Sequence, residues 1–295
     1  MQSQNDASPT LSKAYKNTAK AIKNHPRILI PFLIFACIES LALFFLFLAP
    51  RMPFKALLGP PIRTFRGEAF LHYPYNFLLL PELASFSKMF LSVLLSSLLT
   101  AMAIFMALDI ANKKSLNLAG SLKAAFKKYF SFLTVFFIVT VLFYTLIKVI
   151  DGGLLRLLVY LASGHRKLLF LTSRAWVNTL VIIINFIIAV FIQALFIYAL
   201  PIMVIEKAKV LKSIIRSFVF FRKFFFSTLL LVGIPMLIYI PIVILNQNAN
   251  FLMDNLFPEI VLIVLFIGIF LSSLVIDSMI TISTTYLYLL YKKNI

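Results

Sequence analysis

The stretch from Ile260 to Leu290 reads IVLIVLFIGIFLSSLVIDSMITISTTYLYLL and contains one charged residue, Asp277. A helix of about 20 apolar residues crosses the hydrocarbon core of a bilayer, and in lipid a helix satisfies all of its backbone hydrogen bonds within one segment. This stretch is longer than one crossing needs, so we expect it to tilt or to project from the membrane. It predicts an integral membrane protein.

The composition of the whole chain agrees with that prediction. Of its 295 residues, 62% are hydrophobic and 13% are charged, whereas soluble domains hold about 45–50% and about 25%. We therefore predict an all-α integral membrane fold that forms a single domain over residues 1–295, with a flexible N-terminus at 1–10. The six apolar runs that we expect to span the membrane lie at 28–49, 86–111, 130–150, 175–200, 224–245 and 260–290.

The formal charge of +18 indicates a membrane surface rather than nucleic acid as the partner. The 28 Lys and Arg residues gather beside the apolar runs, where anionic headgroups attract them. Most lie before the first span, in alternate loops and after the last span, which by the positive-inside rule places both termini in the cytoplasm. We expect a multi-pass protein of the cytoplasmic (inner) membrane. Four basic residues of the first outer loop oppose this orientation, namely Arg51, Lys55, Arg63 and Arg66.

Two outer segments interrupt the pattern of spans. Prolines recur between Pro50 and Pro81, too closely for a long helix, so we expect an ordered or partly ordered outer cap there. The segment 154–171 is apolar but contains Gly164, His165 and several basic residues. We expect this second segment to be a helix that lies in the outer interface rather than a span.

Three basic amphipathic stretches each lead directly into an expected span. Their basic residues recur every three or four positions, so they share one helical face and leave apolar residues on the opposite face. We expect each stretch to lie as a helix in the cytoplasmic headgroup layer. The residues that we expect to bind anionic lipid are Lys13, Lys16, Lys20, Lys23, Lys123, Lys127, Lys209, Lys212 and Arg216.

The second and third basic stretches also match each other in sequence. The segment 126–130, FKKYF, is similar to the segment 221–225, FRKFF. A unit of one surface helix followed by a two-span hairpin, repeated three times, would account for the whole chain. The alternative is that basic residues flank each cytoplasmic helix end under the positive-inside rule, without any repeat.

Two segments resemble a known group of proteins. One is LSKAYKNTAKAIKNHPR at 11–27, which leads into ILIPF at 28–32, and the other is LPIMVIE at 200–206, which leads into SIIRS at 213–217. Both are similar to a broad group of six-span bacterial and archaeal membrane proteins, which includes the membrane domain fused to glycerophosphoryl diester phosphodiesterases. The resemblance implies six spans with cytoplasmic surface helices. We expect no phosphodiesterase activity, because these residues include no soluble catalytic domain.

Two acids, Glu39 and Asp277, fall inside expected spans, where ionisable side chains are costly and usually functional. Glu39 lies near the bilayer centre, about 17 Å from the start of its span at 1.5 Å per residue. The sequence shows no evident partner for it. Either it takes part in substrate or proton binding, or it is a protonated acid that hydrogen-bonds another helix.

Polar or small side chains form a stripe on each of three spans. The members of each stripe share one helical face, and we expect the three faces to point inward together. Such an interior either lines a path for a substrate or provides packing contacts between helices. The stripes are Ser92, Ser96, Thr100, Ala103 and Ala107; Asn178, Asn185 and Gln193; and Ser273, Asp277, Thr281, Thr284 and Tyr288.

The sequence lacks the signatures of enzymes and metal sites. The three histidines stand alone, without a second ligand at metal-binding spacing, and Cys37 is the only cysteine. No nucleophile elbow and no phosphate-binding glycine loop occurs. We therefore expect no catalytic residue, no metal and no cofactor.

Two functions are compatible with these features. We expect a non-enzymatic membrane protein that binds or organises anionic lipid, or that scaffolds a membrane protein partner. The alternative is a small transporter or lipid-translocating protein that uses Glu39, Asn185, Gln193, Asp277 and Thr281 in its interior. An accessible cavity that joins Glu39 to Asp277 would favour the transporter, and a tightly packed interior would favour the scaffold.

Overall fold

The computed structural model describes residues 7–163 and 167–293, and every regular element within them is helical. Among these residues, five helices are long and apolar enough to cross a membrane, or six if the pair joined at Phe224 and bent by 98° is counted as one span. The chain is thus a multi-pass membrane protein by the length and composition of its helices. The five helices are Pro26–Phe47, Asn76–Ala111, Tyr129–Ile150, Val181–Ile205 and Ile260–Lys292.

The first two long helices begin the bundle. Helix α1 (Ala7–Asn24) leads through a 3₁₀ turn, η2 (Pro26–Leu29), into α2 (Ile30–Phe47). The chain returns through α4 (Asn76–Leu91), the π-helical segment η4 (Ser92–Ser96) and α5 (Ser97–Ala111). The expected flexible stretch at 1–10 is therefore already helical from Ala7, and residues 1–6 lie outside the described part of the chain.

The second span begins well before its expected start at 86, because α4 continues through Pro81. Proline removes a backbone donor from a helix. Burial of Phe77, Leu79 and Leu80 offsets that cost. Lys88 therefore lies further from the start of its helix than the sequence suggested.

The expected outer cap between these helices is folded. It contains α3 (Phe54–Arg66) and a 3₁₀ turn, η3 (Glu68–Leu71), separated by Gly67 at φ +99°. Two ion pairs, Arg63 with Glu68 and Arg66 with Glu82, join the cap to itself and to α4. Its small hydrophobic core consists of Ala49, Ile62, Leu71 and Leu79.

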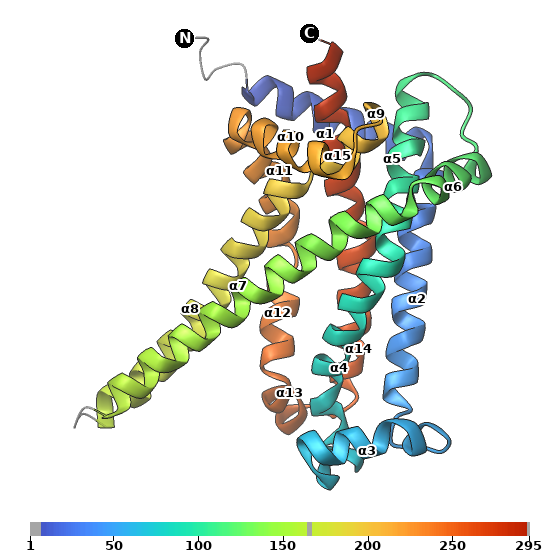
Figure 1. The fold of residues 1–295 in the computed structure, drawn as a ribbon. Helices are drawn as coiled ribbons and strands as arrows, with labels where there is room; N and C mark the ends of the chain where they lie inside the picture. The colour runs from blue at the N-terminus through green and yellow to red at the C-terminus, as the bar shows by residue number, and fades with distance from the viewer. Residues whose placement is uncertain (1–6, 164–166, 294–295) are drawn as a thin grey trace.

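The next two helices form a long hairpin. Helix α6 (Leu118–Lys127) precedes α7 (Tyr129–Ser163), which packs along α8 (Lys167–Phe196). The hairpin diverges from the other helices toward its tip (Figure 1).

The expected separate surface helix at 154–171 is wrong, because α7 continues to Ser163 and α8 begins at Lys167. Gly152 and Gly153 each cost a helix about 1 kcal/mol relative to alanine, and packing along the hairpin offsets that cost. His165, which the sequence analysis also placed in that helix, lies outside the described residues.

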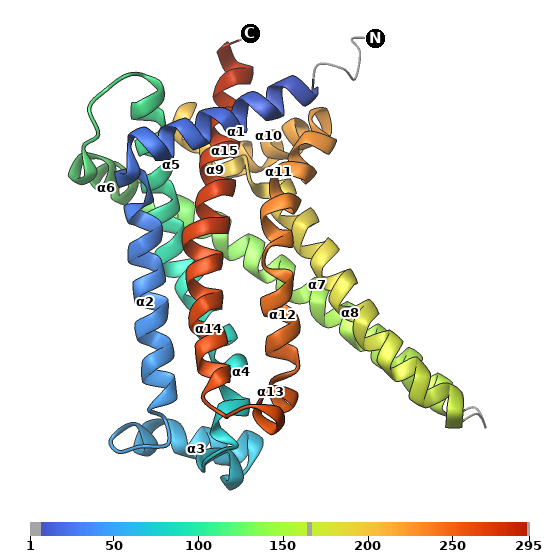
Figure 2. The same ribbon diagram turned by 180° about the vertical axis from the view of Figure 1, so that it is seen from behind.

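The expected span at 224–245 is divided. Helix α9 (Ala199–Ile205) is followed by α10 (Val210–Lys223), which meets α11 (Phe225–Leu237) at the 98° bend. Helix α12 (Ile240–Gln247) follows a break at 238–239, beside Pro235 and Pro241, which cannot donate backbone hydrogen bonds. Together α11 and α12 run along the bundle to α13 (Ala249–Asn255) (Figure 2).

The last long helix lies among the others. It consists of α14 (Ile260–Phe270), the π-helical segment η5 (Leu271–Asp277) and α15 (Ser278–Lys293). Parts of it contact α1, α2, α5 and α11. Its end projects beyond α1 (Figure 1).

The two ends of the bundle differ in their elements. Helices α1, α6, α9 and α10 gather where α15 ends, whereas α3 and α13 lie at the opposite end (Figures 1 and 2). The largest hydrophobic core includes Ala101, Ala103 and Ala107 of α5, which are fully buried. Small residues let helices approach closely in a membrane, so Ala103 and Ala107 of the predicted stripe serve packing.

Candidate functional site

Three charged side chains from three helical segments meet inside the bundle. Lys88 Nζ lies 3.9 Å from Oε1 of Glu39 and donates a hydrogen bond of 2.7 Å to Ser272 Oγ. Ser273 Oγ donates to Oε2 of Glu39 at 2.6 Å. Asp277, at the end of η5, is close enough to interact electrostatically with both Lys88 and Glu39. The predicted acid Glu39 therefore has a lysine partner.

The charges of this cluster do not balance. Glu39 is only 4% exposed, so its carboxylate depends on Lys88 and Ser273 in place of water. When Glu39, Lys88 and Asp277 are all ionised, two negative charges face one positive charge. Because an unneutralised charge away from water is costly, the cluster favours the binding of one proton or one cation.

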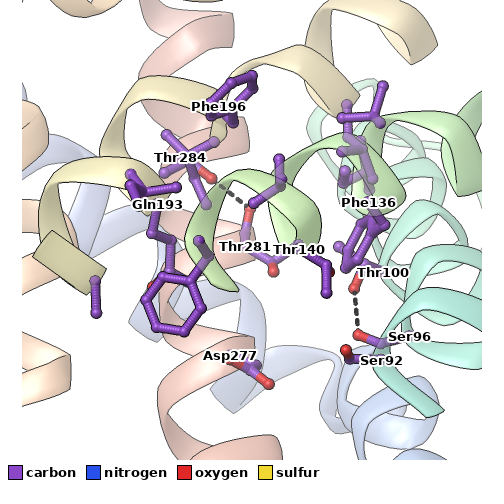
Figure 3. A pocket seen from close by; sticks show the side chains of 18 of the residues that line it. Ser92, Ser96, Thr100, Phe136, Thr140, Gln193, Phe196, Asp277, Thr281 and Thr284 are labelled. Carbon is purple, nitrogen blue, oxygen red and sulfur yellow. Dashed lines mark hydrogen bonds between the residues drawn. The ribbon is translucent and has the colours of Figure 1, made fainter. Parts of the chain in front are cut away.

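A cavity of about 390 Å³ lies beside the cluster, within the range of about 300–1,000 Å³ that is typical of ligand pockets. The walls come from α2, α4, η4, α5, the α7–α8 hairpin, α9, α11 and the last helix. Figure 3 shows polar side chains on facing walls, with the Asp277 carboxylate among them. The polar lining residues are Lys88, Ser92, Ser96, Thr100, Thr140, Gln193, Asp277, Thr281 and Thr284.

Apolar side chains form the rest of the cavity wall. Four phenylalanines and Met236 contribute most of the larger groups, and the phenylalanines are Phe35, Phe136, Phe143 and Phe196. A wall of this composition holds the apolar body of a ligand while a few polar groups orient it.

Two π-helical segments position the polar wall. Segment η4 carries Ser92 and Ser96, and η5 carries Ser273 and ends at Asp277. A π-helical turn changes the direction of the side chains that follow it, and such turns are frequent at functional sites. Ser273 consequently faces Glu39, whereas Asp277 lines the cavity.

The three predicted stripes therefore converge in part. Tyr288 departs from its stripe, because its hydroxyl donates to Glu206 at 2.5 Å at the far end of α15. Asn185 does not line the cavity and lies about two turns along α8 from the residue that does. The side chain of Asn178 lies outside the described part of the chain. The stripe residues that line the cavity are Ser92, Ser96, Thr100, Gln193, Asp277, Thr281 and Thr284.

Sequence reasoning missed Lys88. A lysine near the expected start of a span at 86 normally extends to the membrane surface, so it gave no reason to look for a partner. The earlier start of α4 at Asn76 removes that explanation. Lys88 is four residues before Ser92 and so continues the polar stripe by one turn, which is the signal that would have identified it.

Helices α1, α6 and α10, which carry most of the basic residues predicted to bind lipid, lie at one end of the bundle (Figure 1). Arg216 forms an ion pair with Glu206 there. Burial, followed by the charge of Lys207, lowers the pKa of Lys128 below its usual value. The exposed basic residues predicted for lipid binding are Lys13, Lys16, Lys20, Lys23, Lys123, Lys127, Lys209, Lys212 and Arg216.

No three His, Cys, Asp or Glu side chains are grouped to hold a metal ion within the described residues. Comparisons with family models, with curated proteins and with solved structures found no match. The resemblance to the six-span group stays a prediction from the sequence, and the site itself supports any functional conclusion.

Proposed function

We propose that this protein is a small membrane transporter that binds its substrate in the cavity and couples binding to a proton. The observation that carries the proposal is the carboxylate of Asp277 in the cavity wall, beside the ion pair of Lys88 and Glu39. Ionisable groups inside a membrane are costly and mark substrate or proton pathways. Asp277 and Lys88 both line the cavity, and Glu39 lies behind Lys88 without lining the cavity itself. This link through Lys88 supports the transporter over the scaffold.

Two elements of the cavity wall suit a change of shape. Met236 lies just before the break between α11 and α12, and discontinuous helices are common around transporter binding sites. The opposite wall comes from the α7–α8 hairpin, which diverges from the bundle (Figure 1). A change in the angle of either element alters the cavity opening.

Side-specific cysteine labelling tests this proposal without knowledge of the substrate. A Cys37→Ser background removes the only native thiol, and Thr281→Cys and Gln193→Cys then place thiols in the cavity. Lys212→Cys is the exposed positive control, and Ser283→Cys, at a fully buried position, is the negative control. A membrane-impermeant maleimide is applied to right-side-out and to inside-out vesicles.

We expect both cavity thiols to react faster than the buried control. The accessible side should change with pH, because a proton at Asp277 changes the charge of the cluster. Cavity thiols that stay as unreactive as Ser283→Cys from both sides, while Lys212→Cys reacts, would overturn the transporter proposal.

Organisation of anionic lipid is a second candidate function, favoured by the surface of α10. Leu211, Ile215 and Val219 are 71%, 54% and 65% exposed, beside the exposed Lys212. A helix that exposes both apolar and basic side chains fits a membrane interface. On this basis we propose that α1, α6 and α10 are interfacial amphipathic helices that contact anionic headgroups or a membrane protein partner.

The same helices support a threefold repeat. Each precedes two spans: α1 precedes α2 and α4–α5, α6 precedes α7 and α8, and α10 precedes α11–α12 and α14–α15. We propose that these are three copies of one unit. The excess of basic residues at this end of the bundle supports a cytoplasmic orientation in an inner membrane.

Lipid analysis of the protein in native nanodiscs tests the second candidate. We expect enrichment of one anionic lipid over the bulk membrane. The enrichment should disappear in a variant that changes Lys123, Lys127, Lys209, Lys212 and Arg216 to Gln, because those residues supply the headgroup contacts. Equal lipid content in both proteins would show that the basic residues only set the orientation in the membrane. Copurifying proteins would then be analysed for a membrane partner.

A further inference from the structure

We propose that the cavity binds a lipophilic organic cation, which exchanges with a proton on the carboxylate of Asp277. This inference rests on the proposed transport function and adds the chemical class of the substrate. Three observations support it. The carboxylate that faces the cavity is negative, several wall hydroxyls present lone pairs, and aromatic rings form part of the wall.

The charge that the cavity offers to a ligand is negative. The ammonium group of Lys88 is held by Ser272 and Glu39, and Glu39 is held in turn by Ser273. Within the part of the chain that the structure describes, Asp277 has no hydrogen bond and no ion pair, although it lines the cavity. A cationic group in the cavity therefore meets an acid that has no closer partner.

Several hydroxyl groups of the wall use their protons within the helices and leave acceptors toward the cavity. Ser92 donates its proton to Met89 O at 2.8 Å, and Thr284 donates to Ile280 O at 2.7 Å. Ser96 and Thr100 lie 3.4 Å apart, so that one donates to the other. Because these protons are used within the helices, the hydroxyl lone pairs remain for a ligand, and lone pairs favour a cation over an anion.

The apolar wall fits the body of such a cation. The rings of Phe35, Phe136, Phe143 and Phe196 all line the cavity, and aromatic faces attract cations. The cavity volume of about 390 Å³ admits a molecule with several apolar groups around one charge.

Proton exchange follows from the balance of charge. The charged and titratable groups around Asp277 are Glu39 from α2, Lys88 from α4, and Tyr239, whose ring centroid lies 5.8 Å from Lys88 Nζ. With Lys88 paired to Glu39, either a proton or a cation neutralises Asp277. When the cation binds the protonated form, the O–H bond of the Asp277 carboxyl breaks, the proton passes to water, and the electron pair stays on the carboxylate.

Two ions of the same shape and opposite charge provide the test. Binding of tetraphenylphosphonium and of tetraphenylborate to the purified full-length protein is measured by equilibrium dialysis at several pH values. The variants are Asp277→Asn, Asp277→Glu and the control Asp254→Asn, which removes an exposed acid of α13. Proton release is recorded in weakly buffered solution as the cation is added.

We expect the wild type to bind the cation more tightly than the anion, with about one proton released per cation and weaker binding at lower pH. Asp277→Asn should bind it roughly ten- to a hundredfold more weakly and without pH dependence, since a charge-assisted contact is lost. Asp254→Asn should keep both the affinity and the proton release, and Asp277→Glu should restore the proton release that Asp277→Asn loses.

Two results would overturn the proposal. Preferential binding of tetraphenylborate would show that the substrate class is wrong while the cavity still binds ligands, so the transporter proposal would stand. Equal cation binding by the wild type and Asp277→Asn would remove the role of the carboxylate. Binding of neither ion, together with unreactive cavity thiols in the labelling experiment, would remove the transport function itself.

Discussion

Two ion pairs in this molecule each contact the last long helix, but they differ in how exposed their side chains are. Inside the bundle, Lys88 pairs with Glu39; the Lys88 side chain, which lines the cavity, is 38% exposed and that of Glu39 is 3% exposed. At the basic end, Arg216 pairs with Glu206, and their side chains are 46% and 22% exposed. In each pair the carboxylate also accepts a hydrogen bond from the last long helix, from Ser273 in the first case and from Tyr288 in the second.

The comparison shows how the cost of breaking an ion pair depends on its burial. Breaking a buried pair leaves a charge that water cannot reach, which costs several kcal/mol. Breaking an exposed pair lets water and salt replace the partner, so it costs little. The same chemical contact therefore constrains the interior strongly and the surface weakly.

The largest effect is expected for Lys88→Met. This change leaves Glu39 without its cation and next to Asp277, so we expect a loss of about 3–5 kcal/mol in the free energy of unfolding. Denaturant titration in mixed micelles measures it. The double variant Lys88→Met with Glu39→Gln should recover most of the loss, and failure to recover would show that packing of Lys88 matters more than its charge.

A smaller effect is expected for Ser273→Ala. The variant removes the hydrogen bond of 2.6 Å to Glu39 but leaves Lys88 in place. We expect a loss of about 1–2 kcal/mol, because the bond reaches a charged and buried acceptor. The same titration measures it, with Ser283→Ala as the control, since the Ser283 hydroxyl bonds only to the backbone of its own helix.

Tyr288→Phe is the matched change at the exposed pair. It removes the hydroxyl donor to Glu206 and keeps the aromatic contact with Phe220. We expect a loss of about 0.5–1 kcal/mol, less than for Ser273→Ala, because Arg216 and water still solvate the carboxylate. A loss as large as that of Ser273→Ala would contradict the difference in burial between the two pairs.

The smallest effect is expected for Arg216→Gln. We expect a loss below about 1 kcal/mol, and added salt should abolish it because salt screens exposed charges. Melting temperatures of the wild type and the variant at low and high ionic strength provide the measurement. A salt-independent loss would show that the pair of Arg216 and Glu206 is effectively buried.

The sequence predicted the parts of the fold that depend on local composition. Apolar runs near 28–49 and 260–290 correspond to long helices, since composition alone decides whether a segment enters lipid. The expected span at 224–245 is divided at residues 238–239, between Pro235 and Pro241, and prolines are a local sequence signal for a break in a helix. The long α7–α8 hairpin depends on packing between two segments, which no local pattern reveals.

The residues of the candidate site were likewise predictable from the sequence only in part. Helical spacing identified Gln193, Asp277 and Thr281 as inward-facing polar residues, and all three line one cavity. The partner of Glu39 required knowledge of which helix lies beside α2, because Lys88 is distant in sequence. The π-helical turns also escaped prediction, since a constant angle per residue assigns Ser273 and Asp277 to one face.

The hydroxyls of Ser273 and Tyr288 belong to one unbroken rod, η5 followed by α15. The two residues are separated by about 22 Å at 1.5 Å per residue. A helix is stiff along its axis, so an axial displacement that lengthens the hydrogen bond to Glu39 displaces the tyrosine hydroxyl from Glu206 by a similar amount. The last helix therefore links the interior carboxylate of Glu39 to Glu206 at the basic end through two hydrogen bonds on one element.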